Sequence, residues 1–169
     1  MPESNTRFYR RDGGEALYRR SLYTFWKRHA PPASMEILNA PSREVSCLRR
    51  ERTNTPLHAL VTLNDPQFVE AARALAQRAL RQARGAGDAA VLDVLARRAL
   101  ARPLSAAEAA VVLRTLEGLR AHYRARPEGA RALLGVGEHP ADPALDPAEA
   151  AAWTMAANQI LNLDEFLNK

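Results

Sequence analysis

Hydrophobic side chains recur every three or four residues through most of this chain, which is the spacing of one face of an α-helix. The clearest stripe follows Asp65-Pro66, and its members are Phe68, Val69, Ala72, Leu75, Ala76, Ala79 and Leu80. No stretch alternates convincingly between hydrophobic and polar residues, as a half-buried strand would. The pattern therefore predicts an all-α protein.

Start and stop signals divide this pattern into about six helices. Three of them begin with a capping side chain followed by proline, at Thr55-Pro56, Asp65-Pro66 and Asp146-Pro147. Ser105 and Glu108 form a capping box at the start of another helix, which is expected to end near Pro127. The segment from Gly85 to Asp88 is predicted to end one helix and cap the next.

The first third of the chain is less regular. Tyr18, Leu22, Phe25 and Trp26 lie at helical spacing, so a helix with a core-facing stripe is expected there. Three prolines within residues 31–42 predict an extended, packed crossing, and a helical turn is expected over residues 42–52. We predict an N-terminal tail over residues 1–14 and a single all-α domain, with an irregular Pro-rich N-terminal crossing, over residues 15–169.

The net charge of +5 is unevenly distributed. Residues 1–52 hold eleven Lys/Arg and six Asp/Glu, whereas residues 53–169 hold thirteen of each. Six of the aromatic residues also fall within the first 26 positions. No apolar run approaches the roughly 20 residues of a membrane span, and the N-terminus has no signal-peptide pattern. The basic, aromatic first third is the distinctive part of the composition.

A dense polar cluster surrounds the two helix starts at residues 55–66. Its members are Arg43, Glu44, Arg49, Arg50, Glu51, Arg52, Asn54, His58, Asn64 and Asp65. Arginine binds carboxylates and phosphates through two parallel hydrogen bonds, and helix N-termini favour anions. One interpretation is therefore an anion or acidic-sugar site. The other is an internal Arg–Glu network with two helix caps, at Thr55 and Asp65, that ties the first third to the helical body.

Other candidate chemistry is sparse. The four histidines form no i,i+4 pair, so no metal site is predicted, and His58 is the best acid–base candidate against a packed or surface histidine. The single cysteine, Cys47, excludes an internal disulfide and a Cys-x-x-Cys-His haem attachment, so no cofactor is expected in this chain. Cys47 is either a reactive thiol beside arginines or a buried, inert residue. The basic aromatic N-terminus could also bind nucleic acid or another polyanion, although the helical spacing of its aromatics favours a core.

Several blocks of the chain resemble a known family. They are Leu17–Arg28, Ala30–Pro32, Ala40–Val45, Arg49–Leu57, Leu63–Arg73 and Leu161–Phe166. Together they resemble the planctomycete secreted domain one, also called domain of unknown function 1553, from about residue 13 onward. The resemblance implies a C-terminal domain of longer secreted or periplasmic proteins, which often carry a c-type cytochrome domain and a companion domain. It also implies a link to polysaccharide breakdown, and no established reaction.

This chain departs from the family pattern in ways that shape the expectation. It lacks a secretion signal and a haem-binding motif, and His58 stands where the family pattern leads us to expect Gln. We therefore expect a C-terminal piece of a longer architecture, acting as an accessory or interaction module whose partners are the missing N-terminal domains. The alternatives are a saccharide- or anion-processing enzyme domain that uses the Arg49–Asp65 cluster, and a polyanion binder. We do not expect nucleic acid to be the partner.

Overall fold

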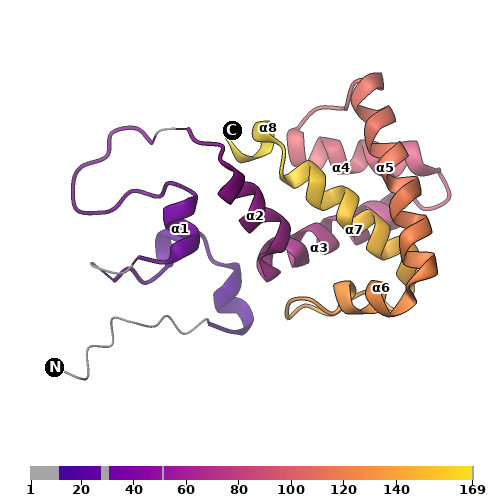
Figure 1. The fold of residues 1–169 in the computed structure, drawn as a ribbon, viewed down its shortest axis with the longest axis horizontal. Helices are drawn as coiled ribbons and strands as arrows, with labels where there is room; N and C mark the ends of the chain where they lie inside the picture. The colour runs from indigo at the N-terminus through magenta and orange to yellow at the C-terminus, as the bar shows by residue number, and fades with distance from the viewer. Residues whose placement is uncertain (1–11, 28–30, 51, 169) are drawn as a thin grey trace. The chain divides into compact units, whose positions relative to one another are not determined.

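The computed structural model describes residues 12–27, 31–50 and 52–168, and these contain helices and no β-strand (Figure 1). The elements are η1 (Gly14–Tyr18), η2 (Ser21–Tyr23), α1 (Ala33–Ile37), α2 (Pro56–Asn64), α3 (Pro66–Gln82), α4 (Asp88–Leu100), α5 (Ala106–Ala125), α6 (Pro127–Leu134), α7 (Pro147–Leu161) and α8 (Asp164–Leu167). Among the described residues, six α-helices have eight or more residues. The all-α prediction is confirmed, although the six long helices are not the same six that the sequence suggested.

The chain divides into two compact units, and the division falls inside α2. Unit 1 is Met1–Val61 and unit 2 is Thr62–Lys169. The tail and domain boundaries proposed from the sequence remain a prediction.

Unit 2 is built around the pair α3 and α7, which lie side by side with α4, α5 and α6 packed against them (Figure 1). Small side chains line the facing surfaces and let the two helices approach closely, including Ala72, Ala76, Ala79, Ala152, Ala156 and Ala157, all fully buried. Trp153, Leu95, Leu116 and Ile160 supply the large apolar volume of this core. The hydrophobic stripe predicted after Asp65-Pro66 is confirmed in α3.

Helix caps in unit 2 follow the sequence signals closely. The Asp65 carboxylate accepts a hydrogen bond from the Gln67 amide at 2.8 Å, and Pro66 takes the first helical position. The capping box at Ser105 has both of its reciprocal hydrogen bonds. The Asp146 side chain accepts from the amide of Glu149 at 2.9 Å. These local signals are reliable because they require only neighbouring residues.

The sequence analysis missed one helix of unit 2. α5 ends at Ala125, near Pro127 as predicted, but Pro127 also begins α6, because proline is tolerated at the first helical position and Ala130 and Leu134 pack against α7. The segment from Gly85 to Asp88 separates α3 from α4 as predicted, with Gly87 at the cap position of α4. Asp88 is the first residue of α4, and its carboxylate binds Arg120.

The prediction of a helix through Tyr18, Leu22, Phe25 and Trp26 in unit 1 is wrong. η1 and η2 are short 3-10 helices, separated by the extended backbone of Arg19 and Arg20. Tyr18, Leu22 and Phe25 are exposed rather than buried. A short helix is marginal in water unless packing stabilises its apolar face, and no hydrophobic side chain in the described part of unit 1 is buried.

The rest of unit 1 is irregular. The Pro-rich crossing contains α1, which begins after Pro32, so this segment is not extended throughout. The helical turn expected over residues 42–52 is not found in its described part, where residues 41–50 form bends and are all exposed. Unit 1 therefore presents most of its side chains to solvent.

Candidate functional site

The polar cluster predicted from the sequence is divided between the two units. Asn64 and Asp65 belong to unit 2, and Glu51 lies outside the described residues. The remaining members, in unit 1, are Arg43, Glu44, Arg49, Arg50, Arg52, Asn54 and His58. Whether the whole set forms one site stays a prediction.

One open hollow exists in the described part of unit 1, with a volume of about 380 Å³. It is lined by Trp26, Ser42, Arg43 and Glu44. The Arg43 guanidinium carbon lies 5.0 Å from the centre of the Trp26 ring, a cation–π distance, and the Arg43 backbone is left-handed, with φ of 63°. The Trp26 indole N–H has no hydrogen-bond partner among the described residues. The lining of the hollow therefore includes the Arg43 guanidinium stacked on the half-buried ring of Trp26.

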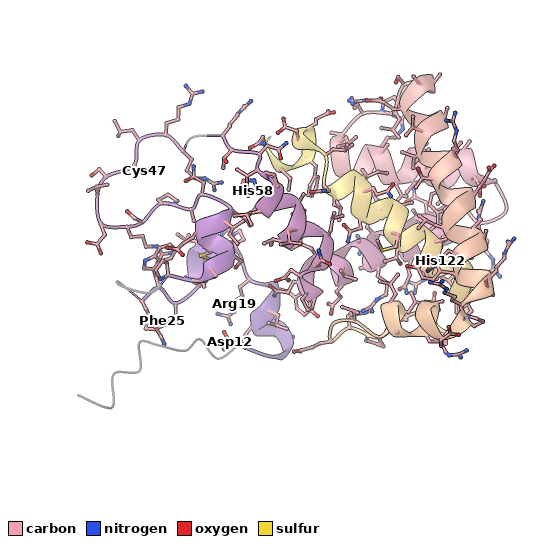
Figure 2. The ribbon with its side chains drawn as sticks, in the orientation of Figure 1. Asp12, Arg19, Phe25, Cys47, His58 and His122 are labelled. Atoms are coloured by element: carbon pink, nitrogen blue, oxygen red, sulfur yellow. The ribbon has the colours of Figure 1, made fainter. Side chains whose placement is uncertain are left out.

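The arginines after this hollow are exposed. Arg50 donates to the carbonyl oxygen of Leu38 at 3.2 Å. Arg49 and Arg52 pair with no carboxylate among the described residues. Cys47 is exposed on the loop that joins α1 to α2, and its thiol lies 3.5 Å from the carbonyl oxygen of Arg49 (Figure 2). The buried form of Cys47 that we considered is therefore wrong.

His58 is the one buried polar side chain in the described part of unit 1, with 3% of its surface exposed. Its Nε2–H donates to the backbone carbonyl of Ile37, which joins α2 to the end of α1. The amide of His58 lies 3.4 Å from the Thr55 hydroxyl, so Thr55 caps α2 as predicted. A buried ring committed to a backbone carbonyl is typical of a packed histidine.

Sequence reasoning missed a buried polar clamp in unit 2. The guanidinium of Arg73, 1% exposed, donates to the carbonyl oxygens of Leu134, Val136 and His139, with 2.6 Å to Val136. The Glu70 carboxylate accepts from the amides of Glu138 and His139. Together these side chains of α3 hold the loop that follows α6.

Gly137 makes the clamp sterically feasible. Its φ is +91°, and an added Cβ would collide with the carboxylate of Glu70. The signal was present in the sequence as two charged residues, Glu70 and Arg73, inside an otherwise apolar stripe. Only the fold shows that they face a loop more than 60 residues away.

Two ion-pair networks of unit 2 are centred on Arg120 and Arg102. Arg120 binds Asp88 at 2.5 Å and Glu149, whose carboxylate also accepts from the Trp153 indole N–H at 2.9 Å. Hydrogen bonding by Arg120 lowers the pKa of Asp88. Arg102 binds Glu108 and Glu165 at 3.0 and 2.6 Å, and its hydrogen bonds lower the pKa of Glu108 to about 2. Both networks connect helices, so their first role is structural.

Large exposed hydrophobic side chains concentrate in unit 1. Ten are exposed among the described residues, and eight of these lie in unit 1: Tyr18, Leu22, Tyr23, Phe25, Val45, Leu48, Leu57 and Leu60. Leu48 is fully exposed, and Phe25 is 72% exposed (Figure 2). Unit 2, the larger unit, contributes only Val111 and Leu163 to this set.

Within the described ranges, no group of three His, Cys, Asp or Glu side chains could hold a metal ion. No helix there is both long and apolar enough to cross a membrane.

The fold and the candidate site define an all-α protein in which a basic, exposed N-terminal unit precedes a helical unit with its own core. The chain belongs to the PSD1 family, described as a protein of unknown function (DUF1553), whose model matches residues 1–116. No curated protein and no solved structure matches the chain.

The matched region gives the family blocks a structural meaning. The block Leu63–Arg73 contains the Asp65 cap together with both clamp residues, Glu70 and Arg73, so its polar positions have structural roles. The match ends inside α5, and the last block that we noted, Leu161–Phe166, lies beyond it.

Proposed function

We propose that this chain is an accessory interaction module without catalytic activity, and that unit 1 carries its docking surface. The observation that supports this function is the concentration of exposed hydrophobic side chains in unit 1. Exposed apolar surface of this kind marks sites of protein–protein contact, because its removal from water stabilises a complex.

The enzyme alternative has less support. A catalytic site requires polar groups that converge on one pocket. Of the ten residues of the polar cluster, only Arg43 and Glu44 are among the residues that line the hollow in the described part of the chain. The Asp65 carboxylate caps α3, and the His58 ring donates a hydrogen bond to the backbone carbonyl of Ile37. These side chains are already committed to holding the fold.

The proposed partners are the domains that the family resemblance implies, a c-type cytochrome domain and its companion domain. In this proposal the chain functions in a secreted or periplasmic system, and the haem belongs to the partner. The basic character of unit 1 supports such an encounter, because complementary charge steers association and suppresses wrong partners.

The test is a binding measurement between this chain and recombinant cytochrome and companion domains from a PSD1-family protein. We expect saturable binding by calorimetry, and about tenfold weakening in the double variant Leu22→Ser, Phe25→Ser. The control is Val111→Ser in α5, an exposed apolar residue of unit 2, which should change the affinity less than about twofold.

Two results would overturn the proposal. One is the absence of binding to either domain. The other is equal weakening by the unit 1 and unit 2 variants, which would show that the exposed apolar residues of unit 1 have no special role.

A further inference from the structure

We propose that the docking surface of unit 1 recognises an acidic protein segment that also carries aromatic or aliphatic side chains. This inference rests on the proposed function and specifies the chemistry of the partner. The carboxylates of the segment would pair with arginines stacked on aromatic rings, and its apolar side chains would cover the exposed hydrophobic residues nearby in unit 1.

The net positive charge of the chain comes from the residues of unit 1. Residues 1–61 hold eleven Lys/Arg and six Asp/Glu, a net charge of 11 − 6 = +5, whereas residues 62–169 hold thirteen of each. A partner surface complementary to unit 1 is therefore acidic, and the attraction should weaken as salt is added.

Unit 1 has no arginine–carboxylate pair among its described residues, and its six described arginines are Arg19, Arg20, Arg43, Arg49, Arg50 and Arg52. Four of the twelve arginines of unit 2 do bind a carboxylate of the same unit: Arg81, Arg97, Arg102 and Arg120. Arg50 donates to the carbonyl oxygen of Leu38, and the other five described arginines of unit 1 have donors available for carboxylates supplied by another molecule.

Two of these arginines are placed to bind carboxylates beside apolar surface. Arg43 stacks on Trp26 at 5.0 Å, and Arg20 lies 5.8 Å from the ring centre of Tyr23. A guanidinium stacked on a ring keeps its N–H donors around its edge, where a carboxylate can accept two parallel hydrogen bonds. Buried arginine and aromatic side chains are also the residues that contribute most at protein interfaces.

The hollow favours a peptide over a densely charged polyanion. Glu44 lines it together with Arg43, and a second negative charge placed beside Glu44 is repelled. A peptide can place one carboxylate at Arg43 while an uncharged part of its backbone passes Glu44. A nucleic acid or sulfated polysaccharide carries closely spaced charges along its whole length, so it cannot pass Glu44 with an uncharged part.

The experiment uses three soluble polymers as probes: poly-L-glutamate, a random copolymer of glutamate and tyrosine, and heparin. Binding to the full chain is measured by fluorescence anisotropy at about 0.15 M salt. We expect the copolymer to bind about tenfold more tightly than polyglutamate, because it supplies apolar contacts in addition to charge. Heparin should bind no more tightly than polyglutamate.

Variants locate the binding on unit 1. Arg43→Asn keeps a residue that tolerates the left-handed backbone and should weaken copolymer binding about tenfold. Arg114→Gln removes one exposed charge from α5 and should weaken it less than about twofold. In NMR spectra, the indole N–H signal of Trp26 should move on binding, while that of Trp153, held by Glu149, should stay in place.

The outcomes separate this inference from the proposed function. Heparin binding as tight as the copolymer, or a copolymer no better than polyglutamate, overturns the acidic and apolar partner. If the cytochrome or companion domain binds, and Leu22→Ser, Phe25→Ser weakens that binding while Arg43→Asn and salt do not, the docking function stands and this inference falls.

Discussion

Units 1 and 2 of this chain differ in how far their hydrophobic side chains are buried and their arginines paired with carboxylates. In unit 2, hydrophobic residues from five helices pack into the larger of two core clusters, and four arginines bind carboxylates of the same unit. In the described part of unit 1, no hydrophobic side chain is buried and none of the six arginines binds a carboxylate. The same residue types therefore stabilise the fold in unit 2 and remain available to another molecule in unit 1.

Helix length explains much of this difference. α3, α5 and α7 have 17, 20 and 15 residues, long enough for a hydrophobic face to meet several neighbours. α1 has five residues and η1 and η2 are shorter than two α-helical turns, so they cannot cover one another. Substitutions should accordingly affect stability in unit 2 and binding in unit 1.

The largest effect is expected for Arg73→Gln, which removes the buried guanidinium of the clamp. Three carbonyls lose a charge-assisted hydrogen bond, and we expect a loss of about 4 kcal/mol in the free energy of unfolding. Denaturant unfolding followed by Trp153 fluorescence, in a Trp26→Phe background, measures unit 2 alone. Arg78→Gln, an exposed change on the same helix, is the control; equal losses in the two variants would show that the clamp does not stabilise unit 2.

Gly137→Ala should be the next largest effect. The added methyl group would collide with the Glu70 carboxylate and strain a left-handed backbone, for a loss of about 3 kcal/mol. Gly85→Ala also has a left-handed backbone, with φ of +78°, but open space around it, and should cost about 1 kcal/mol. The difference between the two variants measures how tightly the loop is held. Similar losses would contradict a closely packed clamp.

Asn158 is a buried side chain of unit 2 that lacks hydrogen-bond partners in the described part of the chain. Its amide is 1% exposed, and neither its nitrogen nor its oxygen has a hydrogen-bond partner among the described residues. Asn158→Leu should therefore stabilise the protein by about 1 kcal/mol. Asn162→Leu should destabilise it by a similar amount, because the Asn162 side chain accepts from Thr62 at 2.5 Å. A destabilising Asn158→Leu would mean that this amide is satisfied in solution.

The smallest effect on stability is expected in unit 1. Leu22→Ser and Phe25→Ser replace exposed side chains and should each change the free energy of unfolding by less than about 0.5 kcal/mol. Leu95→Ala in the core of unit 2 should cost about 3 kcal/mol. A large loss for the unit 1 variants would show that these side chains are packed in solution, and would remove the contrast between the units.

The local signals of the sequence were good guides to unit 2. Asp65, Ser105 and Asp146 cap helices as expected, because a cap depends on residues two or three positions away. The helix at α6 was missed although Pro127 resembles the other proline starts, since the same residue can end one helix and begin another. The spacing of Tyr18, Leu22 and Phe25 predicted a buried helix that unit 1 does not form.

The candidate site was predictable only in part. The cluster around Arg43 and Arg52 was visible in the sequence as a run of charges. The stacking of Arg43 on Trp26 depends on a bend in the backbone that no local rule indicated. The clamp of Glu70 and Arg73 joins residues more than 60 positions apart, so their pairing could not be read from spacing.

The sequence by itself determined the all-α class, the caps and the excess of positive charge before residue 62, because these follow from composition and from neighbouring residues. Tertiary structure decided which apolar stripes are buried and which charges are paired. Burial requires a second surface, and pairing requires a partner brought close by the fold. Unit 2 supplies both for itself, whereas the described part of unit 1 leaves eight large hydrophobic side chains and several arginines exposed to solvent.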